Sequence, residues 1–191
     1  ATHHPRGWNT PLSHQRKVTS YEVETNWYAR WSKRCDATCR IPAFFGAYKE
    51  GDDQWLVMED LDPLFPERKD SLSIAEGVSC LQWLAHFHAT FLQAKPTGLW
   101  DEGTYWHLNT RPEELERMAE GPLKSAAGHI DNALKNATYQ TIVHGDAKVA
   151  NFCFSESGND VAAVDFQYVG GGCGMKDVAY FLGSAYSGQE C

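Results

Sequence analysis

A stretch near the end of the chain, residues 142–166, constrains the fold more than any other feature. It reads IVHGDAKVANFCFSESGNDVAAVDF, with short apolar runs at 152–154 and 161–164. The polar sequence SESGND between these runs is typical of a β-hairpin turn. Because the two ends of a hairpin meet, we expect Asn151, before the first strand, to lie beside Asp165, after the second.

Oxygen-bearing side chains gather at the open end of this predicted hairpin. Mg²⁺ prefers oxygen ligands and takes only one or two from the protein in most phosphate sites. Asn151 and Asp165 can supply such a pair. Asp146, on the loop before Asn151, can face the same point and orient a hydroxyl group. Phosphoryl transfer needs this combination of a metal ion and a carboxylate.

The loop and the end of the hairpin carry a family resemblance. HGDAKVAN, residues 144–151, resembles the catalytic loop of the small-molecule kinases related to aminoglycoside phosphotransferases and choline kinases, and VDFQ resembles their metal-binding segment. The nearest likeness is to the choline-kinase-like and ecdysteroid-kinase-like branch. A lone HGD or DF is common in proteins, and single aspartates in turns are usually caps, so the prediction depends on the whole combination.

The resemblance assigns roles to five residues. It implies that Asp146 is the catalytic base and that Asn151 and Asp165 hold Mg²⁺. Lys148 takes the position of a lysine that contacts the transferred phosphate. Asp177 matches the aspartate that opens the next helix and braces the catalytic loop.

Protein kinases share the His-x-Asp-x-Lys-x-x-Asn spacing and are the nearest alternative among enzymes. The arginine that usually follows their histidine is replaced here by Gly145, and no APE-like motif follows Asp165. A zinc hydrolase is a further alternative, but the eight histidines are scattered and form no HExxH motif.

The amino-acid composition limits the classes of partner that the protein can bind. A net charge of -8 over 191 residues argues against nucleic acid and suits a cationic substrate. The sequence contains no membrane-spanning run and no signal-peptide pattern at its start. Of its six cysteines, Cys35 and Cys39 are four residues apart, but no second pair accompanies them, so we expect reduced thiols and a cytoplasmic protein. The sequence gives no indication of the oligomeric state.

A helix is predicted from Ser20, after an irregular lead-in over residues 1–18. Its helical period places Tyr21, Glu24, Tyr28 and Trp31 on one face. Glu24 either reaches water at the rim of that face or, as the resemblance implies, matches the glutamate that holds the lysine gripping the nucleotide phosphates.

The strand that should carry this lysine, and the glycine-rich loop before it, are not found ahead of the helix. The resemblance therefore implies a chain truncated at both ends or a changed function. Lys17 and Lys148 are the candidates to replace the lysine, although neither stands on the expected strand.

Residues 41–62 predict two strands joined by an acidic turn. Residues 55–61, WLVMEDL, resemble the hinge that offers backbone groups to adenine, which implies adenine contacts at Glu59 and Leu61. An ordinary buried strand followed by a turn fits the same residues.

A long helix is predicted over residues 73–93, with an apolar stripe at Leu81, Leu84, Ala85, His88, Phe91 and Leu92. His86 and His88 point in different directions on a helix and cannot bind one ion together. We expect His88 to brace the catalytic loop from the core.

The remaining segments give coarser predictions. In the loop 99–111, Trp100, Tyr105 and Trp106 either form a substrate wall that binds a cation or pack under the loop. Two further helices are expected, one after Pro112 and one through LKSAAGHIDNALKN. The glycine run at 170–174 predicts a flexible turn.

These features predict an α+β, protein-kinase-like fold with two lobes: residues 1–61 as the remnant of a small lobe with the hinge, and residues 62–191 as a mainly helical large lobe. The predicted function is an ATP- and Mg²⁺-dependent kinase that phosphorylates a hydroxyl of a small-molecule alcohol. The alternative is a non-catalytic, kinase-like binding protein or a fragment without the nucleotide clamp.

Overall fold

The computed structural model describes residues 11–50, 53–104, 107–110 and 112–186 of the 191-residue chain. This part folds into α-helices and three two-stranded antiparallel sheets. The helices are α1 (Pro11–Asn26), α2 (Ile74–Thr90), α3 (Pro112–Arg117), α4 (Pro122–Lys135) and α5 (Met175–Tyr186). The strands are β1 (Phe44–Glu50), β2 (Asp53–Met58), β3 (Gln140–Val143), β4 (Phe152–Phe154), β5 (Val161–Ala163) and β6 (Gly170–Cys173). The sheets pair β1 with β2, β3 with β6, and β4 with β5.

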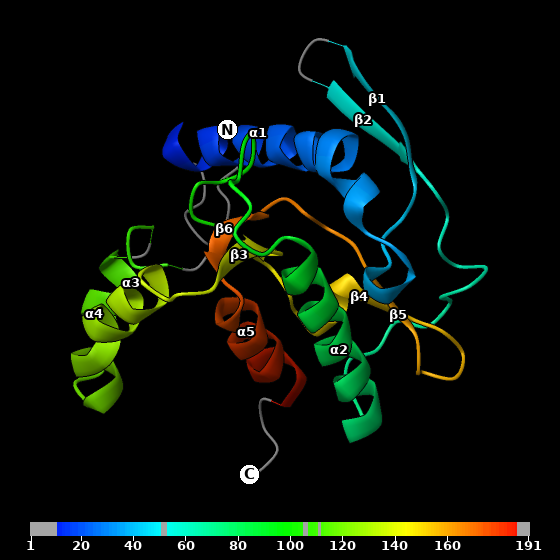
Figure 1. The fold of residues 1–191 in the computed structure, drawn as a ribbon. Helices are drawn as coiled ribbons and strands as arrows, with labels where there is room; N and C mark the ends of the chain where they lie inside the picture. The colour runs from blue at the N-terminus through cyan, green and yellow to red at the C-terminus, as the bar shows by residue number, and fades with distance from the viewer. Residues whose placement is uncertain (1–10, 51–52, 105–106, 111, 187–191) are drawn as a thin grey trace, which may run out of the picture.

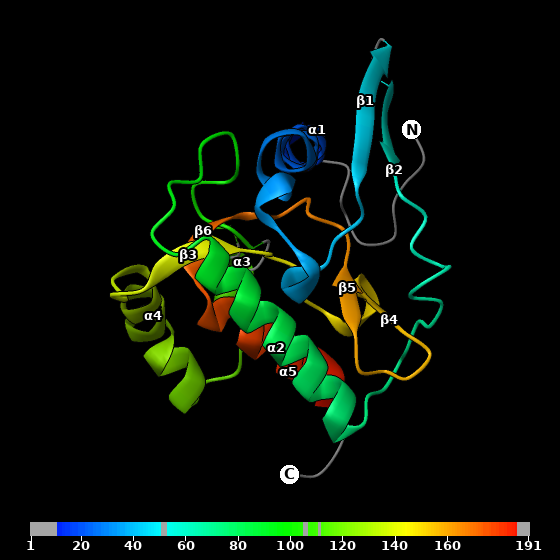
Figure 2. The same ribbon diagram turned by 45° about the vertical axis from the view of Figure 1, so that its right-hand side comes forward.

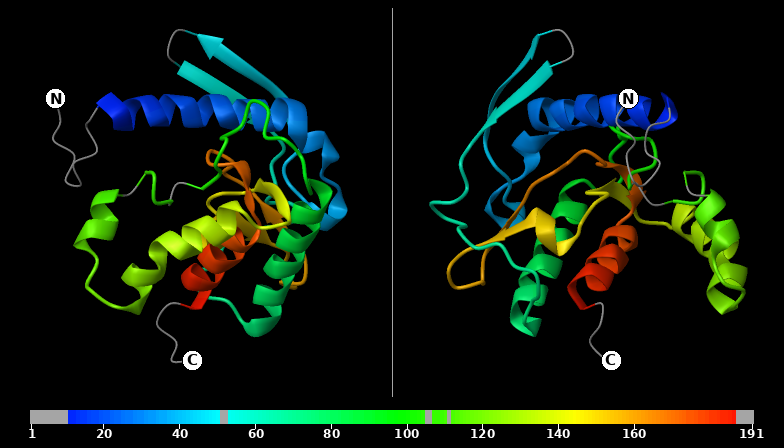
Figure 3. Two further views of the ribbon diagram at one scale, coloured as in Figure 1. Left: turned by 60° about the vertical axis from the view of Figure 1, so that its left-hand side comes forward. Right: turned by 180° about the vertical axis from the view of Figure 1, so that it is seen from behind.

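The three sheets lie at different places around the helices (Figure 1). The β1–β2 hairpin extends away from the body beside α1, while α3 and α4 lie at the opposite side (Figures 1 and 2). α1 lies across one end of the molecule, above β3 and β6, and α2 and α5 run side by side beneath the sheets (Figure 3). No helix in the described part of the chain is long and apolar enough to cross a membrane.

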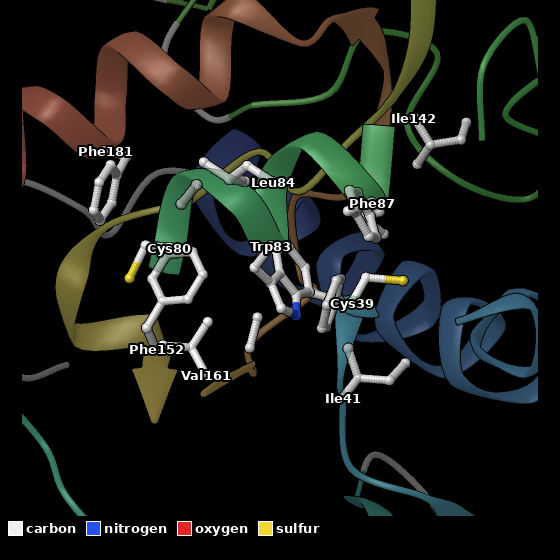
Figure 4. Close-up of a cluster of buried hydrophobic side chains, with 14 of the residues drawn as sticks. Cys39, Ile41, Cys80, Trp83, Leu84, Phe87, Ile142, Phe152, Val161 and Phe181 are labelled. Carbon is white, nitrogen blue, oxygen red and sulfur yellow. The ribbon is translucent and has the colours of Figure 1, made fainter. Parts of the chain in front are cut away.

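The hydrophobic core is built around α2. Trp83 and Leu84 are buried in the middle of this helix, and Trp83 donates its indole N–H to the carbonyl of Arg40 at 2.9 Å. Figure 4 shows Trp83 and Phe87 pointing from α2 towards the side on which Cys39 lies. Aromatic burial of this kind stabilises a fold by several kcal/mol per side chain, about 3–5 kcal/mol for Trp→Ala.

The first helix starts earlier than predicted. Residues 11–18 belong to α1, so the expectation of an irregular lead-in is wrong there, and residues 1–10 lie outside the described part. Proline is well tolerated in the first turn of a helix, where its missing N–H would have no intrahelical partner, so Pro11 is compatible with a helix start. After Asn26 the chain continues as a π-helical turn, Trp27–Trp31.

The buried face of α1 also differs from the prediction. Tyr21 is 37% exposed, whereas Glu24 and Tyr28 are buried as expected. Val23 and Trp27 complete the buried face, and Trp27 stacks on Phe166 with ring centroids 4.7 Å apart. The buried face of the helix is therefore rotated by about one residue from the face that the helical period predicts.

The strands at residues 41–62 and the helix after Ser73 are confirmed. β1 and β2 pair as a hairpin whose turn, residues 51–52, lies outside the described part. Ser73 caps α2 in a capping box with Glu76, because each side chain bonds the backbone N–H of the other residue. The predicted stripe on α2 is partly wrong, since Ala85 and Leu92 are exposed.

The remaining helices and the central hairpin also follow the prediction. α3 begins at Pro112, and α4 spans the segment LKSAAGHIDNALK. The strands β4 and β5 pair antiparallel, with Phe152 opposite Ala163 and Phe154 opposite Val161.

The glycine run at 170–174 is a packed strand and not a flexible turn, so that prediction is wrong. β6 pairs with β3, and its other edge bonds the loop that follows α2: Gly171 N–H donates to Trp100 O at 3.0 Å, and Gly103 N–H donates to Gly171 O at 2.8 Å. A side chain at Gly170 would place its Cβ 2.3 Å from Trp100 O. These glycines let two backbones approach each other closely.

Gly170→Ala should therefore destabilise the protein. The added methyl group must displace the backbone of Trp100, and overpacking of this kind costs about 1–3 kcal/mol. Thermal unfolding followed by circular dichroism measures the change. Gly128→Ala, within α4 and with no atom within 4 Å of the new Cβ, is the matched control and should raise stability by about 0.5–1 kcal/mol. Equal melting temperatures for Gly170→Ala and wild type would contradict the close approach.

Candidate active site

The loop that joins β3 to β4 is anchored by a buried carboxylate. Asp177, in the first turn of α5, is 1% exposed and accepts hydrogen bonds from the backbone N–H groups of His144 at 2.7 Å and Gly145 at 2.9 Å. His88 of α2 lies 2.8 Å from the same carboxylate through its Nε2 atom. Burial alone would raise the pKa of Asp177, but the hydrogen bond and charge of His88, with the other donors, bring it below the ordinary value. The predicted bracing roles of His88 and Asp177 agree with this geometry.

His144 ties the loop to the strand β5. Its Nδ1 atom accepts from the N–H of Asp146 at 3.3 Å, and its Nε2 atom lies 3.0 Å from the carbonyl oxygen of Val164. The acceptor role of Nδ1 assigns the proton to Nε2, which then donates to Val164. The fully buried imidazole, 4.5 Å from the Phe166 ring between centroids, therefore holds the loop and the hairpin end in a fixed relation.

Glycine is required between His144 and Asp146. Gly145 has φ +85°, in the left-handed region, and a Cβ there would lie 2.0 Å from the carbonyl oxygen of Tyr168. The difference from protein kinases at this position therefore has a steric cause, because an arginine would meet the backbone of Tyr168.

Asp146, Lys148 and Asn151 form one hydrogen-bonded cluster. Lys148 Nζ donates to Asp146 Oδ2 at 2.7 Å, and Asn151 Nδ2 donates to Asp146 O at 2.8 Å and to Oδ2 at 3.1 Å. Both side-chain donors use Oδ2, so no described residue bonds Oδ1. Burial lowers the pKa of Lys148, but the hydrogen bond and charge of Asp146 outweigh burial and raise it, so Lys148 is cationic at neutral pH.

Asp165 lies at the other end of the β4–β5 hairpin, beside Asn151. The N–H of Val164 donates to the carbonyl oxygen of Asn151 at 3.0 Å, which brings the two hairpin ends together as predicted. Asp165 has φ +65°, uncommon for a residue with a side chain, and its Oδ1 atom is buried with no hydrogen-bond partner in the described part of the chain. An unpaired buried carboxylate oxygen is costly, and functional sites are where such a cost is retained.

This donor set fits a hard cation such as Mg²⁺. Asp165 offers the unpaired carboxylate oxygen, and the amide oxygen of Asn151 accepts no hydrogen bond from a described residue, because that amide bonds Asp146 through its nitrogen. Both are oxygen ligands of the kind that Mg²⁺ takes beside phosphate.

Glu24 reaches the same region from α1. It is 9% exposed, so its predicted alternative position at a solvent rim is wrong. Its Oε1 atom accepts from the N–H of Phe166 at 3.1 Å. Burial, and then the negative charge of Asp165, raise the pKa of Glu24 to about 7.

Within the described residues no lysine or arginine pairs with Glu24. Lys148 is bonded to Asp146, and Lys17 lies 5.9 Å above the ring of Tyr21. Neither of the two candidate replacement lysines is therefore placed on Glu24.

The predicted hinge residues adjoin β2. The Glu59 carboxylate pairs with Arg40 at 2.5 Å and accepts from the N–H of Ala43 at 2.9 Å, and the hydrogen bond from Arg40 lowers the pKa of Glu59. Leu61 is buried, and its carbonyl accepts from the N–H groups of Leu64 and Phe65. No described residue bonds the carbonyl of Glu59 or the N–H of Leu61.

The aromatic loop gives a mixed result. Trp100 donates its indole N–H to the carbonyl of Gln167 at 2.8 Å and packs against the core, so it fits the packing alternative. Tyr105 and Trp106 lie outside the described residues.

Two residues near the site were not predicted from the sequence. Arg40 joins Glu59 to the core, and Ser184 of α5 accepts from the N–H of Val149 at 3.1 Å. Ser184 lies two helical turns after Asp177, on the same face of α5, so the helical period was the available signal. No comparable signal marks Arg40, because its partner is distant in sequence.

The comparison with known families agrees with this geometry. Residues 13–190 match the profile of the phosphotransferase enzyme family, and the chain belongs to that family. Membership implies phosphate transfer as the class of activity and confirms the resemblance at the level of the family. A search of curated proteins found no match.

Asp177→Asn should weaken the fold in a pH-dependent way. The Asp177 carboxylate is buried and accepts from His88 and from two backbone N–H groups, so loss of its charge should cost about 2–4 kcal/mol at pH 7. Because the pKa of Asp177 is depressed in the folded state, its contribution is present above its unfolded pKa and is lost as the pH falls through the folded value. Urea unfolding at pH 7 and at about pH 3 measures the free energy of unfolding. The difference in this free energy between Asp177→Asn and wild type should shrink at the lower pH. Exposed Asp160→Asn is the control, and a constant difference at both pH values would contradict the assignment.

Proposed function

We propose that this protein is an ATP- and Mg²⁺-dependent kinase that phosphorylates a hydroxyl group of a small molecule. The observation that carries the proposal is the buried Oδ1 atom of Asp165 beside Asn151, which no described residue pairs. Next to it lies the carboxylate of Asp146, whose Oδ1 atom is likewise bonded by no described residue. A fold that only needed stability would pair these oxygens or replace them.

Asp146 acts as the base. Lys148 and Asn151 hold its Oδ2 atom, which fixes the carboxylate and leaves Oδ1 to accept a hydrogen bond from the acceptor hydroxyl. The carboxylate orients the hydroxyl oxygen towards the terminal phosphate of ATP and takes its proton as the new P–O bond forms.

Negative charge on the phosphates is offset by Lys148 and by the Mg²⁺ that the two hairpin ligands would hold. The ammonium group of Lys148 is cationic and offsets charge on the moving phosphate. Asn151 and Asp165 would hold Mg²⁺, which when bound neutralises the nucleotide phosphates.

The nucleotide base is placed by backbone groups at the hinge. The carbonyl of Glu59 and the N–H of Leu61, which no described residue bonds, suit the amino group and the ring nitrogen of adenine. The ion pair of Glu59 with Arg40 keeps the Glu59 side chain away from this edge. Glu24 faces the phosphate region, where its buried carboxylate suits a cation.

In this proposal residues 1–61 form the smaller lobe and residues 62–191 the larger lobe, with the nucleotide between them. The motif at residues 144–151 favours the choline-kinase-like and ecdysteroid-kinase-like branch. The net charge of -8 favours a cationic alcohol, and the free cysteines favour a cytoplasmic location.

A second candidate is a non-catalytic, kinase-like binding protein. It is favoured by one observation: the buried Glu24 carboxylate has no cationic partner among the described residues, although a nucleotide clamp of this kind needs one. The two candidates differ in whether they turn over ATP.

Asp146→Asn should reduce turnover by about 10²–10⁴-fold, because the amide cannot take the hydroxyl proton. The assay follows ADP release with a panel of amino alcohols, sterols and aminoglycosides. Exposed Asp160→Asn should keep wild-type turnover. Unchanged turnover in Asp146→Asn would show that the assigned base is wrong.

ATP should stabilise the protein only when Mg²⁺ is present. At a nucleotide concentration of about 100 times Kd, binding adds about 2.7 kcal/mol, or roughly 5–10 °C in melting temperature. Asp165→Asn should remove most of this shift. Turnover without the shift in wild type would contradict the metal assignment, and the shift without turnover for any acceptor would favour the binding protein.

A further inference from the structure

Arg40, in the short segment before β1, is bonded through its backbone to the core and to the central hairpin. Its carbonyl oxygen accepts from the indole N–H of Trp83 in α2 at 2.9 Å and from the N–H of Ala163 in β5 at 3.0 Å. Ala163 is the last residue of β5 and comes two residues before Asp165, a proposed Mg²⁺ ligand. The backbone of Arg40 is therefore fixed to the end of the hairpin that carries Asp165.

The side chain of Arg40 reaches a different part of the proposed nucleotide site, the hinge after β2. Its guanidinium group pairs with the Glu59 carboxylate at 2.5 Å, and the two side chains are only 25% and 24% exposed. The other oxygen of this carboxylate accepts from the N–H of Ala43 at 2.9 Å, and the N–H of Glu59 donates to the carbonyl of Ala43 at 2.9 Å. Within the described residues Arg40 is the one cation paired with Glu59. Glu59 is thus held through both its side chain and its backbone.

These bonds leave the proposed adenine-facing groups unused. No described residue bonds the carbonyl of Glu59 or the N–H of Leu61. The amino group of adenine donates and its neighbouring ring nitrogen accepts, so adenine matches this pair. Guanine places a carbonyl oxygen and an N–H at the same positions, where each would face a group of its own kind. A site built from such groups discriminates between the two bases only while the groups are held in place.

We propose that Arg40 is a positioning residue of the nucleotide site, which fixes the hinge relative to the hairpin end that carries Asp165. The two ends of one residue then set the separation between the groups that take the base and those that take the metal. The inference rests on the proposed function, because it needs a nucleotide that spans both places. Arg40 acts through Glu59 and through Ala163, and it contacts no ligand itself.

Two single variants and their combination test the proposal in the full chain. Arg40→Gln and Glu59→Gln each remove one charge of the pair and keep the backbone groups of both residues. Calorimetric titration with Mg²⁺ present gives the dissociation constant of ATP and, by displacement of ATP, that of GTP. In each single variant the Kd of ATP should rise about five- to tenfold, as for one weakened hydrogen bond, while that of GTP changes by less than about twofold.

The ratio of the GTP and ATP dissociation constants separates positioning from stability. A variant that only loses folded protein weakens the binding of both nucleotides by the same factor, so its ratio stays at the wild-type value. The double variant should lose no more than either single variant, because both substitutions remove the same interaction. Arg117→Gln is the matched control and should keep the wild-type ratio, since its pair with Glu113 in α3 is 77% and 74% exposed.

An unchanged ratio in Arg40→Gln, or a double variant in which the two losses multiply, would overturn the proposal. Equal binding of ATP and GTP by the wild-type protein would also overturn it, because the hinge would then not select the base. These outcomes leave the proposed kinase intact, whereas a wild-type protein that binds neither nucleotide contradicts the proposed function itself. If Arg40→Gln does not fold, Glu59→Gln decides the matter from the other side of the pair.

Discussion

The structure depends on the buried carboxylate of Asp177. A charge at 1% exposure persists only with donors around it, and Asp177 has three, from His88, His144 and Gly145. The two backbone donors belong to the loop between β3 and β4, and the third belongs to α2. One side chain in the first turn of α5 therefore joins the core helix to the loop. The position of Asp146 follows, because it comes directly after Gly145.

The carboxylates around this loop differ in how their oxygens are satisfied. Asp177 uses both oxygens in bonds that hold the backbone, which suits a structural role. Within the part of the chain that the structure describes, Asp165 keeps one oxygen buried and unpaired, and Asp146 uses only one of its two oxygens. Glu24 adds a carboxyl whose pKa is raised to about 7 by burial and then by the negative charge of Asp165. Unpaired and buried charged groups of this kind are costly, and functional sites are where such a cost is retained.

Much of the site could be predicted because it is local in sequence. Asp146, Lys148 and Asn151 are close along the chain, and the hairpin brings Asp165 back to them through ordinary turn chemistry. The predictions of secondary structure and burial were wrong where a segment distant in sequence decides the local structure. The glycine run at residues 170–174 is a strand because the loop at Trp100 lies against it, and no feature of the run itself shows this. The buried face of α1 shifted from Tyr21 because packing against Phe166 favours Trp27.

The sequence by itself determined the class of side chains in the loop and hairpin, their spacing, and the helices and strands that carry them. Only the tertiary structure decided which carboxylates are paired. His88 reaches Asp177 across 89 positions, and Glu24 reaches Phe166 across 142. Such contacts leave no periodic signal in the sequence, because they depend on how whole elements pack and not on the period of any one of them.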